Sequence, residues 1–360
     1  MSSPLKFPAA VLALGVAASA MIALPLLAQS QGQNRLPREC VAEIRDLCAQ
    51  DGARDRGAIR ECLREKRSEL SSDCAAQLHN RMEQRRSGAG GARGAAGLVN
   101  PYQALAKPDR TVIYGEHQRQ QVDVYEPADA VEPLPLVVFI HGGGWTMGSH
   151  QAVQTKPAFF NDAGYYFASA GYRLVPDVTM EQQAADLGEG LRALLGQASA
   201  IGFDPGNIVL MGHSAGAHLA ALLATDPAYA GDAFGAIRGV VLLDGAGYDV
   251  AANMAEGGPQ VWQIYNRAFG RDPARQAALS PITHVGGPDA PHWLGLYVAE
   301  RAMAKSQTEA LIAALAQAGA NASAVPISDI DHSRMNRELG TEAGAAQSEA
   351  VIAFLDAITG

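Results

Sequence analysis

The chain is short of basic charge, and this shortage excludes one class of partner at once. Its formal net charge is −9 at pH 7, with 28 Lys and Arg against 37 Asp and Glu, so nothing favours binding to nucleic acid. Spacings typical of zinc sites, such as Cys-x₂-Cys and His-Glu-x₂-His, do not occur, and we expect neither a metal nor a cofactor. Internal repeats are missing as well. Apolar residues nevertheless make up 48% of the chain, which is ample for the core of a large domain.

Long apolar runs are also lacking, with one exception at the N-terminus. Residues 7–28 are rich in Ala and Leu, follow Lys6 and end in Leu-Leu-Ala before a polar stretch. This pattern is typical of an export signal, so we predict a signal peptide over residues 1–28 and a periplasmic or secreted protein. Two alternatives stay open: cleavage after Ala20, and an uncleaved membrane anchor, because a run of this length can span a bilayer.

Cysteine is confined to one short segment. All four cysteines lie within residues 36–86, where two charged stretches predict helices joined by a turn. In a helical hairpin, residues at equal distances from the turn meet, which predicts nested disulfides, Cys48–Cys62 inside Cys40–Cys74. A bond between Cys40 and Cys48 is excluded, because eight residues of helix rise about 12 Å. The spacing resembles that of cysteine-rich repeats of Golgi-type glycoproteins; a zinc site is the rival interpretation, and the segment's role is either a stabilised spacer or a docking module.

A Gly- and Ala-rich stretch separates this segment from the rest of the chain. Residues 87–99 hold almost no bulky apolar side chain and predict a flexible linker. Residues 100–360 are therefore expected to form one large domain.

The most informative motif of this domain is Gly-His-Ser-Ala-Gly at residues 212–216. It follows an apolar run that predicts a buried strand and precedes a run that predicts a helix. A Gly-x-Ser-x-Gly in this setting is typical of a nucleophile elbow, a turn so tight that it requires glycine on both sides of the serine. The motif predicts Ser214 as a nucleophile, with the backbone N–H of Ala215 facing the place where an oxyanion forms.

A second motif, His-Gly-Gly-Gly-Trp at residues 141–145, follows another apolar strand about 70 residues earlier. Glycines let backbone N–H groups approach a substrate oxygen closely. Gly143 and Gly144 are therefore predicted to complete the oxyanion hole.

Together the two motifs resemble those of the α/β-hydrolase superfamily, in particular the HGGG-type esterases of the hormone-sensitive-lipase and arylformamidase-like group. The resemblance covers about residues 100–360 and extends to the segments at 172–176, 183–186 and 278–282. It implies an α/β-hydrolase fold, a mostly parallel central sheet with helices on both faces. Here a small disulfide-stapled helical hairpin precedes that fold.

The resemblance also implies a catalytic triad in the chain order serine, acid, histidine. His332 is the last histidine and follows a short apolar strand, so it is predicted as the general base. Counting back from the start of the next helix predicts Glu300 as the acid, after a buried strand at residues 293–298. Three aspartates are fallbacks for this role: Asp289, Asp329 and Asp331. Asp244, at the end of another strand, is interpreted as a loop cap.

These predictions describe an exported serine esterase. We expect it to cleave a carboxylic ester of a small acyl or aryl substrate through an acyl-enzyme intermediate. An arylformamidase or amidase on the same site, and a catalytically silent binding protein, are the alternatives. The stretch at residues 248–280 is either a small lid over the acyl pocket or a packed connection.

Overall fold

The structure is a computed structural model, and it describes residues 38–49, 62, 66, 69–71, 74, 106–128, 130 and 132–359. The predicted signal peptide at residues 1–28 and the predicted linker at 87–99 lie outside the described residues. In the described ranges, no helix is both long and apolar enough to cross a membrane.

The cysteine-rich segment carries the two nested disulfides. Helix α1 (Arg38–Ala49) bears two of the cysteines. Cys40 is bonded to Cys74 and Cys48 to Cys62, with Cα–Cα distances of 5.2 and 5.8 Å. This pairing confirms the prediction. Each bond closes a loop whose unfolded entropy it reduces, which stabilises the segment by roughly 3 kcal/mol per disulfide.

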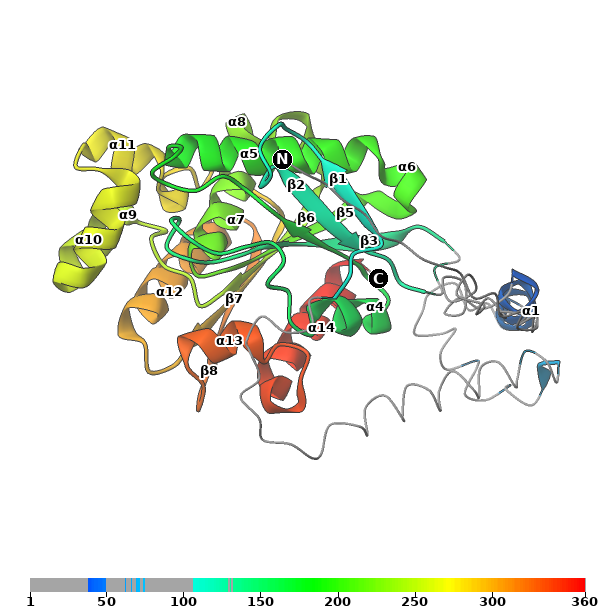
Figure 1. The fold of residues 1–360 in the computed structure, drawn as a ribbon. Coiled ribbons are helices and arrows are strands. Elements are labelled where there is room, and N and C mark those ends of the chain that lie inside the picture. The colour runs from blue at the N-terminus through cyan, green and yellow to red at the C-terminus, as the bar shows by residue number, and fades with distance from the viewer. Residues whose placement is uncertain are drawn as a thin grey trace, which may run out of the picture. The chain divides into compact units, whose positions relative to one another are not determined.

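The large domain is built on one eight-stranded sheet, in the order β1-β2-β4-β3-β5-β6-β7-β8 (Figure 1). The first two neighbour pairs, β1 with β2 and β2 with β4, are antiparallel, and all the others are parallel. The strands are β1 (Arg110–Ile113), β2 (Gln121–Tyr125), β3 (Leu134–Ile140), β4 (Tyr166–Ala170), β5 (Phe203–His213), β6 (Ile237–Leu243), β7 (His292–Val298) and β8 (Asn321–Ile327).

Helices cover both faces of this sheet, as the apolar strands require (Figure 1). All seven residues of β3 are buried, which is typical of a strand covered on both sides. Its alternate residues enter two cores: Val138 belongs to the core that includes residues of α5, α7 and α12, whereas Phe139 belongs to the core that includes residues of α4 and α14. The helices that supply these residues are α4 (Lys156–Ala163), α5 (Met180–Gly196), α7 (Ala215–Thr225), α12 (Ala302–Gln317) and α14 (Ala345–Thr359). The predicted α/β-hydrolase fold is confirmed.

The remaining helices of the large domain connect strands or follow them. They are α6 (Ala198–Ile201), α8 (Pro227–Ala230), α9 (Val250–Glu256), α10 (Gly258–Phe269), α11 (Pro273–Ala278) and α13 (His332–Arg337), with 3₁₀ turns η2 (Gly231–Ala236), η3 (Pro281–Thr283) and η4 (Glu342–Gly344). Helices α9 to α11 fill the connection between β6 and β7. There Tyr265 and Phe269 pack edge to face on Trp145, at ring-centroid distances of 4.9 and 4.8 Å. This connection is therefore packed against the glycine-rich loop that carries Trp145.

Candidate active site

Ser214 stands alone between a central strand and a buried helix. It follows β5 and precedes α7, with φ 56° and ψ −120°, a conformation that costs a non-glycine residue of order 1–3 kcal/mol. A Cβ at Gly212 would lie 2.2 Å from the carbonyl oxygen of Gly216, and a Cβ at Gly216 would lie 2.1 Å from that of Ile140. Any side chain at either flanking position would clash with the backbone, so both must be glycine. The tight turn that they permit lifts the serine hydroxyl out of the sheet.

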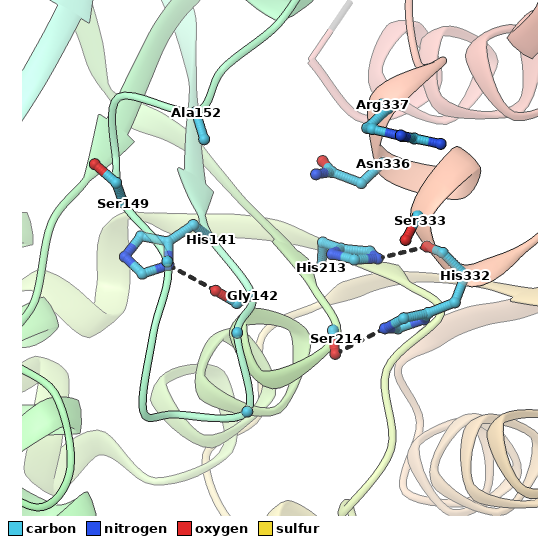
Figure 2. A pocket seen from close by; sticks show the side chains of 13 residues that line it. His141, Gly142, Ser149, Ala152, His213, Ser214, His332, Ser333, Asn336 and Arg337 are labelled. Atoms are coloured by element: carbon cyan, nitrogen blue, oxygen red, sulfur yellow. Dashed lines mark hydrogen bonds between the residues drawn. The ribbon is translucent and has the colours of Figure 1, made fainter. Parts of the chain in front are cut away.

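His332 reaches this hydroxyl from the far end of the sheet. It is the first residue of α13, and its Nε2 lies 3.0 Å from Ser214 Oγ (Figure 2). The ring nitrogen Nε2 of His213 lies 2.8 Å from the carbonyl oxygen of His332, to which it donates a hydrogen bond (Figure 2). Burial lowers the pKa of His213 to about 3, so this histidine is a neutral donor that holds the backbone of His332 in place.

A buried lysine fixes α13, the helix that begins with His332. Lys156, the first residue of α4, is fully buried and donates hydrogen bonds from Nζ to the carbonyl oxygen of Asn336, at 2.8 Å, and to Gln154 Oε1, at 3.0 Å. Burial lowers its pKa to about 7. Because Asn336 lies one turn after His332, this contact fixes the position of α13.

The carboxylate that contacts His332 is Asp244. Its Oδ2 lies 2.7 Å from His332 Nδ1, its Oδ1 accepts the backbone N–H of Val298 at 3.0 Å, and its side chain is fully buried. Burial acts to raise the pKa of Asp244, but the hydrogen bonds from His332 and Val298 and the positive charge of Arg301 outweigh it, so the pKa is lowered. The group is therefore a carboxylate at neutral pH.

The prediction that Glu300 orients His332 is wrong. Glu300 is exposed after β7, and within the described ranges it makes no hydrogen bond or ion pair with His332. The physical reason is the parallel pairing of β6 and β7, in which Leu243 lies opposite Leu296, so that the turns after both strands converge on one place. Asp244 reaches His332 from the turn after β6. The interpretation of Asp244 as a loop cap is therefore wrong as well. The available signal was a carboxylate directly after a strand whose last five residues are all buried.

The three fallback aspartates serve local turns instead. Asp331 caps α13 by accepting the N–H of Arg334, and Asp289 accepts the N–H of Gly286, each at 2.8 Å. Asp329 has φ 59°, and its carbonyl oxygen accepts a hydrogen bond from Arg334. Among the residues that the structure describes, none of these three carboxylates is hydrogen-bonded to the His332 imidazole.

The glycine-rich loop faces the serine with free backbone donors. Gly143 and Gly144 have φ +130° and +55°, values that favour glycine, and a Cβ at Gly143 would lie 2.2 Å from the carbonyl oxygen of Met147. In the part of the chain that the structure describes, the N–H groups of Gly143, Gly144 and Ala215 donate no hydrogen bond. Three donors near one serine can stabilise an oxyanion.

Two segments outside the motifs support this loop from behind. The hydroxyl of Tyr172 donates to the carbonyl oxygen of His141 at 2.7 Å. The carbonyl oxygen of Trp145 accepts from Gln183 Nε2 at 2.7 Å and from the N–H of Val175 at 3.0 Å. The sequence segments at 172–176 and 183–186 thus hold the loop in shape.

A pocket of about 500 Å³ opens above Ser214. One wall is the loop that runs from His141 to Ala152, and the other is α13, from which Asn336 and Arg337 line the pocket (Figure 2). No carboxylate is among the lining side chains. Within the described ranges, no cluster of three or more His, Cys, Asp or Glu side chains suits a metal ion.

Comparison with known proteins agrees with this geometry. The BD-FAE family model matches residues 122–235. A probable isoprenylcysteine alpha-carbonyl methylesterase from Oryza sativa subsp. japonica is 37% identical over 112 residues, which are 31% of this chain and 27% of that protein. Kynurenine formamidase from Danio rerio is 30% identical over 139 residues, 39% of this chain and 46% of that one. The chain thus spans less than half the length of either of these two relatives.

Solved structures show the same fold. The esterase of Pyrobaculum calidifontis superposes with a TM-score of 0.56 at 24% identity, covering 66% of this chain and 81% of that one. Esterase B from Lactobacillus rhamnosis gives a TM-score of 0.60 at 22% identity, covering 78% and 94%. With the strand order, these structures show that the chain has the α/β-hydrolase fold, and part of its sequence is similar to esterases and to a formamidase.

Proposed function

We propose that this protein is an exported serine hydrolase that cleaves carboxylic esters of small acyl or aryl substrates. The observation that carries the proposal is the continuous chain Ser214–His332–Asp244, with contacts of 3.0 and 2.7 Å. Its supports are the free N–H groups of the glycine-rich loop and the similarity to esterases. Two disulfides favour an oxidising compartment, which supports export.

The reaction follows from these positions. His332 Nε2 takes the proton of Ser214 Oγ as the oxygen attacks the ester carbonyl carbon, and the N–H groups of Gly143, Gly144 and Ala215 bind the resulting oxyanion. The carbon–oxygen bond to the alcohol then breaks, and the imidazolium gives its proton to the leaving alcohol. Water attacks the acyl-enzyme in the same way, which releases the acid and restores the serine. Asp244 holds the imidazole and stabilises its charged form throughout.

A second candidate substrate is an N-formyl amide, because kynurenine formamidase from Danio rerio is among the similar proteins. The same serine, base and oxyanion donors serve either reaction. Ester cleavage is the better supported, since the methylesterase of Oryza sativa subsp. japonica is 37% identical against 30% for the formamidase of Danio rerio, and carboxylesterases appear among both the sequence and the structural relatives.

A substrate comparison with one variant tests the proposal. Purified protein is assayed with p-nitrophenyl acetate and butyrate and with N-formylkynurenine, beside Ser214→Ala. We expect the esters to be cleaved, and the variant to lose on the order of 10⁴-fold or more in kcat with its fold retained. Ester turnover above about one tenth of wild type in Ser214→Ala would refute the nucleophile. No turnover of any substrate by folded wild type would favour the silent binding protein.

A further inference from the structure

Arg301 touches both partners of the Asp244–His332 pair. It lies between β7 and α12, beside the exposed Glu300. One guanidinium nitrogen, Nη1, contacts Asp244 Oδ2 and also lies 2.7 Å from His332 Nδ1. The side chain of Arg301 is 40% exposed, whereas that of Asp244 is fully buried, so the arginine is the partner that is free to move away.

The two contacts of His332 Nδ1 require opposite proton positions. A guanidinium only donates hydrogen bonds, so Nδ1 must offer its lone pair to Arg301, and the ring proton then sits on Nε2. A protonated Nε2 cannot take the proton of Ser214. A hydrogen bond to Asp244 instead needs the proton on Nδ1, which leaves the Nε2 lone pair facing the serine.

We propose that Arg301 is a positioning residue that restrains His332 as a base. By competing for Asp244 Oδ2 it favours the unproductive ring tautomer, and its positive charge opposes the imidazolium that forms as the serine attacks. The inference rests on the proposed serine hydrolase function for its kinetic meaning, although the contact itself does not depend on any substrate.

The remaining groups around His332 do not provide the same effect. His213, whose ring centroid lies 4.6 Å from that of His332, is neutral because burial lowers its pKa. Lys156 donates its hydrogen bond to the backbone of α13 at Asn336, one turn after His332, and not to the imidazole. The other charged or titratable groups nearby are Asp331, Arg334, Arg337 and Glu338 on the segment of His332, Glu300 beside Arg301, and Tyr248 and Tyr265, which interact electrostatically with Asp244 and Arg301. Among the described residues, Arg301 is the cation in contact with the imidazole.

The test compares three variants in two measurements. Arg301→Gln removes the charge, and Arg301→Lys keeps the charge but not the guanidinium group. Lys305→Gln, the matched control, removes an exposed charge from the first turn of α12, directly after Arg301. The first measurement is the pH profile of kcat/KM with p-nitrophenyl acetate. The second is the titration of the His332 imidazole by ¹⁵N NMR without substrate, assigned with His332→Gln.

In Arg301→Gln we expect the acidic limb of the profile and the imidazole titration midpoint to move to higher pH by about 0.5–1 unit. The plateau of kcat/KM should be retained or raised, Arg301→Lys should show less than half of the shift, and Lys305→Gln should show none. An unmoved midpoint in folded Arg301→Gln would overturn the inference, whatever happens to the plateau. If wild type hydrolyses nothing, the proposed function fails, but the NMR titration still decides the role of Arg301.

Discussion

Replacing Asp244 by asparagine should nearly abolish hydrolysis while leaving the fold intact. The carboxylate has two fixed partners, the N–H of Val298 on Oδ1 and His332 Nδ1 on Oδ2. An asparagine of the same shape can keep only one oxygen acceptor. With that oxygen on Val298, its NH₂ faces His332 and demands the lone pair of Nδ1, which puts the ring proton on the wrong nitrogen.

The size of the loss follows from the tautomer argument. Loss of the correct tautomer and of the charge that stabilises imidazolium costs about 10⁴-fold in kcat in a serine protease with this geometry, which corresponds to about 5.4 kcal/mol in activation free energy. Glu300→Gln is the matched control, because it removes a carboxylate on an exposed side chain without contact to His332. We expect its kcat to stay within about twofold of wild type.

The assay is kcat on p-nitrophenyl acetate at pH 8 for wild type and both variants, with circular dichroism and thermal melts to verify folding. A folded Asp244→Asn that keeps more than about one tenth of the wild-type kcat would show that the carboxylate contact is not used. A large loss of kcat in Glu300→Gln but not in Asp244→Asn would refute the assignment of Asp244 as the triad acid.

Two further predictions concern stability. Three buried histidines, His141, His213 and His218, have pKa values that burial lowers to about 4, 3 and 4. In the unfolded chain their pKa is near 6.5. Their contribution to stability is therefore complete above pH 6.5 and is lost as the pH falls towards the lowered values. The melting temperature should therefore drop between pH 8 and pH 5, with roughly 2 kcal/mol lost per histidine, and a flat profile over that range would contradict their neutral burial. Gly216→Ala should destabilise the fold by about 1–3 kcal/mol or more in urea melts, because its Cβ would meet the carbonyl oxygen of Ile140. Gly196→Ala, where nothing lies within 4 Å, should be neutral or slightly stabilising, and equal losses in both variants would refute the packing argument.

What the sequence predicted correctly depends on short stretches of chain. The fold followed from motifs that each join one strand to one turn, such as the elbow around Ser214. The nested disulfides followed from the symmetry of a single helical hairpin, with Cys40 bonded to Cys74. These patterns involve residues close together in the chain, so the sequence alone is enough to predict them.

What the sequence did not predict depends on which distant segments meet. Asp244 and Glu300 follow two adjacent parallel strands, and only the pairing of Leu243 with Leu296 shows that the earlier turn reaches His332. The contact of Arg301 with both triad partners, and the bond from buried Lys156 to α13, likewise join segments far apart in the chain. The boundaries of the cysteine-rich segment and the export signal stay predictions.

The most direct test of the central claim is covalent labelling of the active wild-type protein with a fluorophosphonate. The reagent needs an activated serine beside a base and an oxyanion hole, which is the arrangement of Ser214, His332 and the glycine-rich loop. Intact mass spectrometry should show one adduct that accompanies complete loss of esterase activity, and peptide mapping should place it on Ser214. An adduct on another serine, or full inactivation with Ser214 unmodified, would contradict the account.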